Sequence, residues 1–512
     1  MRRRQVRTRI ALLLIGLIGL AACEPNATPG PAVEYSPAIS GFEAVVGACR
    51  ETDPALDLPA LVASKPEGSA LCLAPGTYRL TVPLVLKRGQ KLIGAGGGGQ
   101  TVISGAKSVS ATKEGRYWVI GGQSSLGTSM FPDTTTDQCR PVEGVDSNGM
   151  CVYKDQVFLD DRSLWQVDSL GDLSSGEFFW DYAVNRIYLA DDPSGRKLEV
   201  SVASDGISGG TEVELRNLVV EKFGNGVQSG AVSAGVNWLL TGVEVRLNHG
   251  GGVRMGPGTI VRNSFIHHNG ELGIAGGQAD CSRAKGIVLE NSELSYNNAA
   301  GYNWGWEAGA TKWVYTDGLI VRNNYIHDNY GNGLWTDGFN INTVYEGNMV
   351  EDNYGAGIIH ELGFAAVIRN NVIEGNGFQH PVPGDVWGAG IFIAEARDVE
   401  VYGNTVEDNA GGITAVQQDR IGDQCGIGLN NEVVNLFVHD NTIVQATGVA
   451  AGLRVNISDH SYYTSKNNRW TNNSYQLDDL NATRFVWQSS HIDAEAWRSH
   501  GQDDSGENFG ES

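Results

Sequence analysis

The chain has 512 residues, of which 41% are hydrophobic, so it is long enough to bury a large core. Its 59 acidic residues outnumber its 37 basic ones and give a formal net charge of −22. No basic stripe appears, which argues against nucleic acid as a partner, and the acidic balance disfavours a strongly anionic glycan unless calcium bridges the two.

The first 22 residues predict a signal for export. Arg2, Arg3 and Arg4 begin a basic start, and the apolar run from Ile10 to Leu20 is too short for an ordinary membrane span. The run ends in Leu-Ala-Ala-Cys, which resembles the bacterial lipoprotein box. The resemblance implies cleavage before Cys23 and lipidation of that residue. The alternative is an ordinary secretory signal followed by a chance cysteine.

Residues 23–40 predict a tether between the lipid and the folded part. They contain Pro25, Pro29, Pro31 and Pro37 and show no apolar periodicity. We therefore expect an extracytoplasmic protein at the cell surface or in the periplasm, attached to the membrane by its lipid anchor alone. We expect the folded part to be a monomer.

Residues 41–107 predict the N-terminal coils of a β-structure. A Pro-Gly-Thr-Tyr turn at 75–78, a glycine-rich turn at 94–99 and a Thr-Val-Ile-Ser-Gly strand at 101–105 resemble the first coils of pectate-lyase-like β-helices. The glycine run is not a phosphate-binding loop, because no Gly-Lys-Ser/Thr ending follows it.

Residues 108–202 lack any repeat and predict a small β insertion that flanks the first coils. Alternating strands and turn dipeptides fill the stretch from Gln156 to Ser201. We interpret its aromatic side chains as the core of this insertion rather than as a sugar platform: Trp165, Phe178, Phe179, Trp180 and Tyr182.

Residues 203–480 carry a repeat of the form Asn-Asn-x-Ile/Val-x-x-Asn. Successive copies begin 21 to 33 residues apart, and their closing residues are Asn248, Asn269, Asn297, Asn329, Asn353, Asn376 and Asn409. A period of this length with β-branched residues at alternate positions predicts a solenoid of short strands, in which stacked coils bury one apolar column. The abundance of Gly and Asn, which helices tolerate poorly, and of Val and Ile, which strands favour, argues against helical repeats. A β-propeller would need longer and more regular repeats.

The recurring Asn predicts the internal architecture of this solenoid. A side-chain amide can occupy a turn and, when coils stack in register, can bond to the amides above and below it. The pattern resembles the right-handed parallel β-helix proteins with their Asn ladders. The fold class that we predict is therefore all-β: a right-handed parallel β-helix solenoid with an N-terminal β insertion and a C-terminal cap.

Six cysteines besides Cys23 predict disulfides in an exported protein. Spacing alone does not fix their connectivity. We expect two local bridges, Cys49–Cys72 and Cys139–Cys151, and one between distant loops, Cys281–Cys425.

Residues 481–512 predict a C-terminal cap and an acidic tail. The last coil of a solenoid must be covered, and Ile492–His500 predicts a short capping helix. The acidic end, Asp503–Glu511, predicts disorder.

The candidate site lies where the repeat is interrupted. Aligning coils places Gly333–Asp337 over Gly357–Glu361, so that Asp337 and Glu361 are 24 residues, or one coil, apart. We expect their Cα atoms to be about 5 Å apart, with both side chains on one outer face. Glu307 falls in the corresponding region of the preceding coil, after a loose alignment. Three stacked carboxylates are costly unless they bind a cation or share a proton.

Two chemistries suit these residues. In glycoside hydrolysis, Asp337 and Glu361 fit the close spacing of a retaining pair, and Glu307 with Glu361 fits the wide spacing of an inverting one. In polysaccharide elimination, Lys312 or His360 would be the base and the acidic cluster would hold calcium, the one cofactor that the sequence leaves open. Four nearby indoles are candidate platforms for sugar rings: Trp304, Trp306, Trp313 and Trp335.

The motifs GLWTD and GIIHE, each followed by a strand and Asn-Asn, resemble a group of secreted bacterial β-helix repeat proteins loosely grouped with pectate-lyase-like enzymes. The resemblance implies the fold and a polysaccharide partner, but no named activity. Hydrolysis, elimination and a non-catalytic glycan-binding or structural role remain open at this point.

Overall fold

The computed structural model describes residues 51–96, 100–129, 139, 151–278, 280–378, 386–420, 422–423, 425–426, 428–445, 447–504 and 509–511. The predicted signal and tether, with Cys23 and Cys49, lie outside the described residues. No helix among the residues described is long and apolar enough to cross a membrane.

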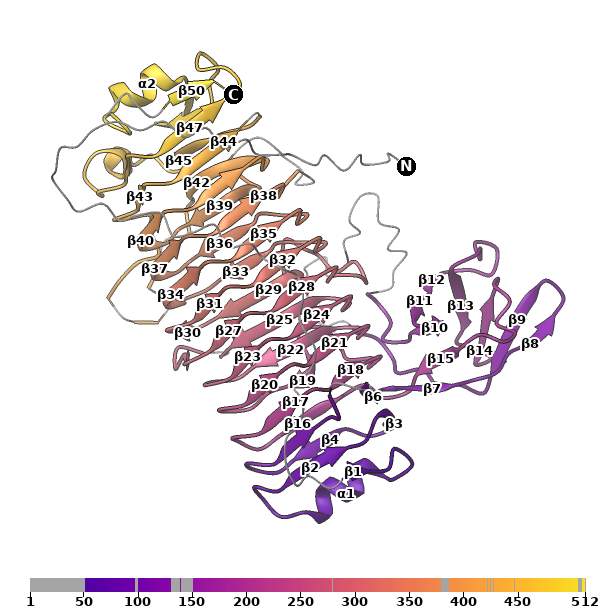
Figure 1. Ribbon diagram of the computed structural model, residues 1–512. Coiled ribbons are helices and arrows are strands. Elements are labelled where there is room, and N and C mark those ends of the chain that lie inside the picture. Colours follow the sequence, from indigo (N-terminus) through magenta and orange to yellow (C-terminus); the bar gives the residue numbers. More distant parts are fainter. Residues whose placement is uncertain are drawn as a thin grey trace, which may run out of the picture. The chain divides into compact units, whose positions relative to one another are not determined.

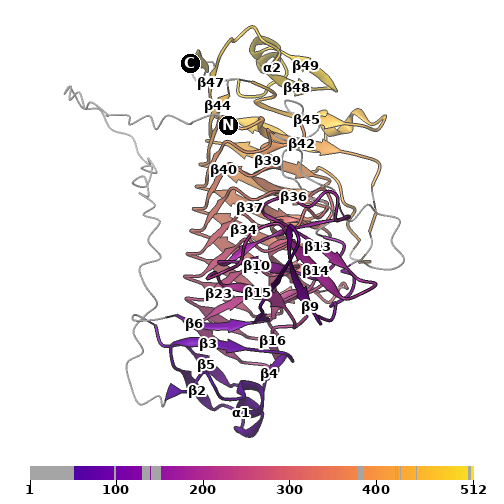
Figure 2. The same cartoon turned by 90° about the vertical axis from the view of Figure 1, so that its right-hand side faces the viewer.

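Three long sheets, here named A, B and C, run the length of the solenoid (Figures 1 and 2). Sheet A consists of β1 (Glu51–Thr52), β2 (Ala70–Leu73), β5 (Lys91–Ile93), β17 (Glu214–Arg216), β20 (Leu239–Thr241), β23 (Ile260–Arg262), β26 (Ala284–Lys285), β27 (Val288–Glu290), β30 (Thr316–Asp317), β31 (Ile320–Arg322), β34 (Ile341–Glu346), β37 (Phe364–Arg369), β40 (Arg397–Tyr402), β43 (Phe437–His439) and β46 (Arg469–Thr471). Sheet B consists of β3 (Gly76–Arg79), β6 (Thr101–Ser104), β18 (Val219–Glu221), β21 (Glu244–Arg246), β24 (Phe265–His267), β28 (Glu293–Ser295), β32 (Tyr325–His327), β35 (Met349–Glu351), β38 (Val372–Glu374), β41 (Thr405–Glu407), β44 (Thr442–Gln445), β47 (Ser474–Leu477) and β50 (Phe509–Glu511). Sheet C consists of β4 (Leu84–Leu86), β16 (Ile207–Gly209), β19 (Gly230–Ser233), β22 (Gly251–Met255), β25 (Leu272–Gly277), β29 (Gly309–Val314), β33 (Leu334–Thr336), β36 (Ile358–Glu361), β39 (Ala389–Ala394), β42 (Gly411–Gln417), β45 (Ala451–Val455), β48 (Phe485–Trp487) and β49 (Ser490–Ile492).

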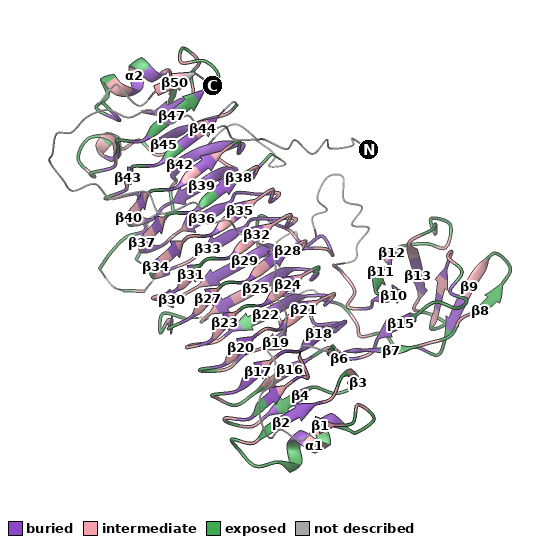
Figure 3. Ribbon diagram, in the orientation of Figure 1, coloured by how far each residue is buried: buried purple, intermediate pink, exposed green. Residues whose placement is uncertain are grey.

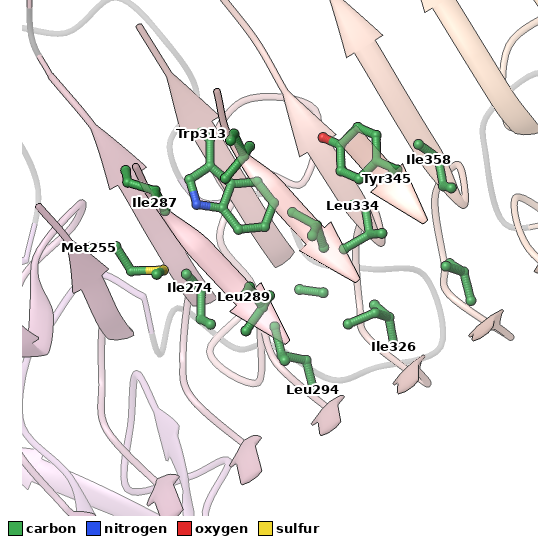
Figure 4. Close-up of a cluster of buried hydrophobic side chains, with 14 of the residues drawn as sticks. Met255, Ile274, Ile287, Leu289, Leu294, Trp313, Ile326, Leu334, Tyr345 and Ile358 are labelled. Atoms are coloured by element: carbon green, nitrogen blue, oxygen red, sulfur yellow. The ribbon is translucent and has the colours of Figure 1, made fainter. Parts of the chain in front are cut away.

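Most coils contribute one strand to each sheet, and neighbouring coils pair in parallel, whereas β48 and β49 pair antiparallel at the C-terminal end. One example of the parallel pairing is that of β33 with β36, where Leu334 lies beside Ile358. Alternate side chains point inward, as the β-branched repeat predicts, and they fill a continuous apolar column (Figures 3 and 4). The predicted parallel β-helix is therefore confirmed.

Two asparagine ladders run along the interior, where the sequence predicted one. The predicted ladder, from Asn248 to Asn409, joins successive Nδ2 and Oδ1 atoms at 2.9 to 3.0 Å. The second ladder uses the Asn that follows the turn residue (Asn, Gly or Asp) of each coil, from Asn324 to Asn473, and ends on Asp503. The residue before it instead forms the turn, for example Asn323 at φ 54°. Each of the two residues therefore has its own physical role.

The insertion is an antiparallel-rich unit with its own core (Figure 1). Its strands are β7 (Ala106–Ser108), β8 (Thr112–Glu114), β9 (Tyr117–Gly121), β10 (Val157–Leu159), β11 (Arg162–Ser163), β12 (Trp165–Val167), β13 (Glu177–Asp181), β14 (Arg186–Leu189) and β15 (Leu198–Ser201). Phe178 and Trp180 are buried in its core, and Tyr182 packs against it. Trp165 packs instead in a cluster with Tyr302 and Trp304 of the coils. Lys222 of the coils binds Glu199 of β15 at 2.6 Å and ties the two parts together.

Both ends of the solenoid are covered. The helix α1 (Leu58–Ser64) packs against β4 at the N-terminal end and was not predicted. At the other end, the 3₁₀ helix η1 (His460–Tyr463) and the helix α2 (Ala494–Ser499) lie beside indoles that pack edge to face, and α2 falls within the predicted capping segment. The prediction of a disordered end is wrong for its last part, because β50 (Phe509–Glu511) pairs with β47.

Two of the expected disulfides are confirmed, Cys139–Cys151 and Cys281–Cys425. Cys72 is also disulfide-bonded. The expected pairing of Cys72 with Cys49 stays a prediction, because Cys49 lies outside the described residues.

Candidate functional site

The outer face of sheet C brings the predicted carboxylates together. Strand β33 pairs with β36 so that Trp335 lies beside Ile359 and Thr336 beside His360. The next residues along, Asp337 and Glu361, therefore occupy equivalent positions in adjacent coils, about 4.8 Å apart along the stack. The alignment of these coils that the sequence predicted is correct.

Lys312 on β29 lies at the centre of this group. Its strand is the neighbour of β33, because Trp313 pairs with Thr336. The Lys312 ammonium lies 3.0 Å from Asp337 Oδ2 and 3.3 Å from Glu307 Oε1. It also lies 3.8 Å from the centre of the Trp335 ring, and its side chain is only 5% exposed. A protein cation thus occupies the space between two of the three predicted carboxylates.

Glu307 reaches the site from a loop and not from the stack. The residue in register with Asp337 one coil earlier is Val314, because Trp313 pairs with Thr336. Glu307 precedes β29, and its backbone N–H donates to the carbonyl of Asn303. The expected column of three carboxylates is therefore a stacked pair, with a third carboxylate that Lys312 links to Asp337.

Glu361 is held by two donors that the sequence did not predict as partners. Trp335 Nε1 donates to Glu361 Oε2 at 3.2 Å, and Arg420 Nη2 donates to Glu361 Oε1 at 2.7 Å. Arg420 also binds Glu395, which is fully buried just after β39. Arg420 lies 59 residues after Glu361 in an irregular loop, so no repeat pattern pointed to it.

The pKa values of the buried carboxyls are raised. Burial raises the pKa of Glu307, and the Asp337 charge adds to this effect. Burial also raises the pKa of Glu361, again with a contribution from Asp337 and against the opposing effect of Arg420. Burial alone would lower the pKa of Lys312, but the carboxylates of Asp337 and Glu307 outweigh it and raise that pKa. Lys312 is therefore charged at neutral pH.

The structure corrects two candidate bases. His360 is fully buried, its Nδ1 lies 2.8 Å from Thr336 Oγ1, and burial lowers its pKa to about 4. It points into the column of the solenoid and cannot reach a bound polysaccharide. The raised pKa of Lys312 likewise argues against its role as a base, since a base must first be neutral.

The predicted sugar platforms also need correction. Trp313 is completely buried and packs among Ile287, Leu289 and Leu334 in the core (Figure 4). Trp335 and Trp304 are on the outer side but are 5% and 7% exposed, so their faces are largely covered. Trp306 is the most exposed of the four and packs against the cluster that contains Tyr302 and Trp304.

A further buried acid lies behind Glu307. Glu271 is fully buried, its Oε2 accepts from the backbone N–H of Gln228 at 2.8 Å, and its Oε1 has no hydrogen-bond partner among the described residues. Burial, aided by the Glu307 charge, raises its pKa well above the ordinary value. No pattern in the sequence indicated Glu271, because this residue precedes its strand at a position with no repeat signature.

The residues do not form an evident metal centre. In the part of the chain that the structure describes, no group of three or more His, Cys, Asp or Glu side chains is arranged to hold a metal ion. The Lys312 ammonium already lies among the carboxylates that were expected to bind calcium. Two apolar clusters border the group, one with Trp335, Ile359 and Phe392 and one with Tyr302 and Trp304.

Comparison with known proteins supports the fold. A family model described as "Right handed beta helix region" matches residues 225–406. A structure of XylC in complex with xylose superposes with a TM-score of 0.60 at 13% identity, covering 77% of this chain and 73% of that one. The solenoid is thus a right-handed parallel β-helix.

Two further solved structures are similar at lower scores. A mannuronic acid specific polysaccharide family 6 lyase from human gut microbiota has a TM-score of 0.47 at 12% identity and covers 90% of each chain. The A-module of the mannuronan C-5 epimerase AlgE6 from Azotobacter vinelandii has a TM-score of 0.43 at 17% identity, covering 89% of this chain and 93% of that one. No curated protein sequence matches the chain.

Proposed function

We propose that this protein hydrolyses glycosidic bonds of an extracellular polysaccharide, with Asp337 and Glu361 as the reacting pair. The observation that carries the proposal is their equivalent position in adjacent coils, on a face where Lys312 and Arg420 hold them. We take the class of ligand, a saccharide, from the xylose complex of similar fold. The chemistry is argued from the residues of this chain.

The environments of the two carboxyls suggest their roles. Glu361 has a raised pKa because it is buried and faces the Asp337 charge, so it suits the general acid that protonates the departing oxygen. Asp337 is the most exposed of the three carboxylates at 25% and is paired with the Lys312 ammonium, so it suits the nucleophile. Asp337 and Glu361 sit one coil apart, about 4.8 Å along the stack, and a close carboxyl pair of this kind favours retention of the anomeric configuration.

Elimination is the less well supported chemistry. It needs an unprotonated base beside the uronate, which for Lys or His means the neutral form, and a cation that neutralises the substrate carboxylate. His360 faces the core, and Lys312 is charged and paired with two protein carboxylates. Neither of the two predicted bases therefore combines the protonation state and the position that this role requires.

The test is a panel of neutral and acidic polysaccharides that is followed by two readouts. New reducing ends report hydrolysis or elimination, and ultraviolet absorbance of unsaturated uronates reports elimination alone. We expect reducing ends without absorbance, and loss of about a hundredfold or more in kcat/KM for Asp337→Asn and Glu361→Gln.

Matched controls separate chemistry from folding. Asp205→Asn and Glu407→Gln make the same substitutions at residues away from the site, and both should keep wild-type activity. Absorbance from unsaturated uronates, or full activity in Asp337→Asn, would overturn the proposed mechanism. Binding without turnover on every polymer would favour a non-catalytic glycan-binding protein.

We also propose that lipidated Cys23 anchors the protein to the cell envelope, since Leu-Ala-Ala-Cys resembles a lipoprotein box. Expression of wild type and Cys23→Ala in a bacterial host, followed by membrane fractionation, tests this proposal. Wild type should sediment with membranes and Cys23→Ala should not. Equal fractionation of the two would contradict it.

A further inference from the structure

We infer that the sugar unit bound at Asp337 and Glu361 carries no carboxylate, so that the substrate is a neutral or amino-sugar glycan and not a polyuronate. The inference rests on the proposed function, and it narrows the substrate class of that same site. It is drawn from how the charges of the site are paired.

Both cations of the site are already engaged by carboxylates of the protein. Lys312 Nζ lies 3.0 Å from Asp337 and 3.3 Å from Glu307. Arg420 Nη2 lies 2.7 Å from Glu361 and also binds Glu395. Each cation thus joins two protein carboxylates.

The Lys312 ammonium is also shielded from a ligand. The centre of the Trp335 ring lies 3.8 Å from the ammonium, which also donates a hydrogen bond to the carbonyl of Trp306. The Lys312 side chain is only 5% exposed. Turning toward a substrate would break these contacts and leave two carboxylates uncompensated. Such a break is costly at a buried ion pair.

The ion-paired side chains of the site carry a net negative charge when all of them are ionised. Lys312 and Arg420 are paired with four carboxylates, those of Glu307, Asp337, Glu361 and Glu395. These six side chains together have a net charge of −2. When Glu361 is protonated as the general acid, the net charge of the group is still −1. A uronate bound at these residues would therefore add a like charge to a partly dehydrated, acidic site.

The neighbouring guanidinium groups do not change this balance. Arg254 is in register with Ala275 of the next coil, and Ala275 is in register with Lys312 of the coil after that. Arg254 therefore lies two coils, or about 10 Å, from Lys312 along the stack. Arg283 donates to the carbonyl of Phe339 at 3.0 Å, and its Nη2 is buried. Arg254 could contact a sugar further along a chain, but not one between Asp337 and Glu361.

The experiment compares polymers with and without carboxylates: in two pairs only the carboxyl group is altered, and in the third a whole uronate branch is absent. The pairs are methyl-esterified and de-esterified homogalacturonan, alginate and carboxyl-reduced alginate, and xylan with and without glucuronate branches, with chitosan as the cationic probe. Initial rates give kcat/KM, and affinity electrophoresis gives binding. We expect at least roughly tenfold higher kcat/KM, or tighter binding, for the carboxylate-free member of whichever pair is accepted.

Two variants should shift this preference in opposite directions. Glu395→Gln frees Arg420 from one partner and should narrow the gap between the paired polymers. Arg420→Gln removes a positive charge and should widen it. Glu407→Gln, at the outer face of sheet B, should leave the ratio of rates unchanged.

The outcomes separate this inference from the proposed function. Hydrolysis that is faster on the uronate polymer overturns the inference while the hydrolase proposal stands. Preferred binding of carboxylate-free polymers without turnover supports the inference and overturns the hydrolase proposal. Neither binding nor turnover in any pair overturns both.

Discussion

Neighbouring residues on one strand face opposite sides of the sheet and therefore lie in different environments. His360 and Glu361 are adjacent, yet His360 is buried in the column and Glu361 faces the candidate site. The period of two in a strand explains the difference. The sequence did not decide between the two faces, because Ile358 and Ile359 are both apolar and either could have been the inward one.

Glu271 supplies a prediction about pH. Burial raises its folded-state pKa well above 4.5, whereas the unfolded chain releases this proton near 4.5. The folded state therefore binds more protons between these two values, and the associated stability is present below pH 4.5 and lost as pH rises through the folded pKa. Glu271→Gln removes this loss, so the variant should gain stability relative to wild type as pH rises. Thermal unfolding of both proteins across this window measures the gain, and parallel curves would refute it.

The ladders act at the level of the coil. Asn353 Nδ2 donates to Asn376 Oδ1 and to the carbonyl of Ile326. Asn353 Oδ1 accepts two hydrogen bonds from Asn329, one from its Nδ2 and one from its backbone N–H. Each Asn therefore binds the turns above and below its own. Loss of one amide leaves several buried polar groups without partners, and this is costly.

We therefore predict that Asn353→Ala lowers the free energy of unfolding by about 3 kcal/mol. Asn370→Gly is the matched control, because Asn370 forms a turn at φ 56°, a conformation that glycine adopts without strain. Chemical denaturation measures both effects. A loss for Asn353→Ala no greater than that for the control would contradict the role of the ladder.

The sequence predicted the coils well and the loops poorly. A repeat fixes which residues of successive coils are neighbours, so the pairing of Asp337 with Glu361 followed from spacing alone. Loops between coils follow no such rule. Arg420, and the approach of Glu307 from a loop, depend on loop conformation and were beyond any pattern in the sequence. Glu395 lies one position past the aligned column and could have been found by extending the alignment.

On the scale of the whole molecule, a solenoid has two ends that must be covered. At the C-terminal end, Trp470, Trp487 and Trp497 pack edge to face, and Asp503 closes the second ladder. Open strand edges and exposed indoles would otherwise promote association of chains.

Removal of residues 481–512 should therefore cause the protein to form soluble aggregates or to precipitate. Removal of residues 505–512 takes away β50 but keeps α2 and Asp503, and should have a much smaller effect. Size-exclusion chromatography with light scattering distinguishes the two. A monodisperse monomer after the longer truncation would show that the cap is dispensable.

The stacking of coils is also what creates the proposed reacting pair, because it makes Asp337 and Glu361 neighbours although 24 residues separate them. The most direct measurement is proton NMR of the first product released from an accepted polysaccharide, recorded before mutarotation. We predict the anomeric configuration of the substrate, because a carboxyl pair contributed by adjacent coils favours a retaining mechanism. An inverted product would contradict the pairing of Asp337 with Glu361.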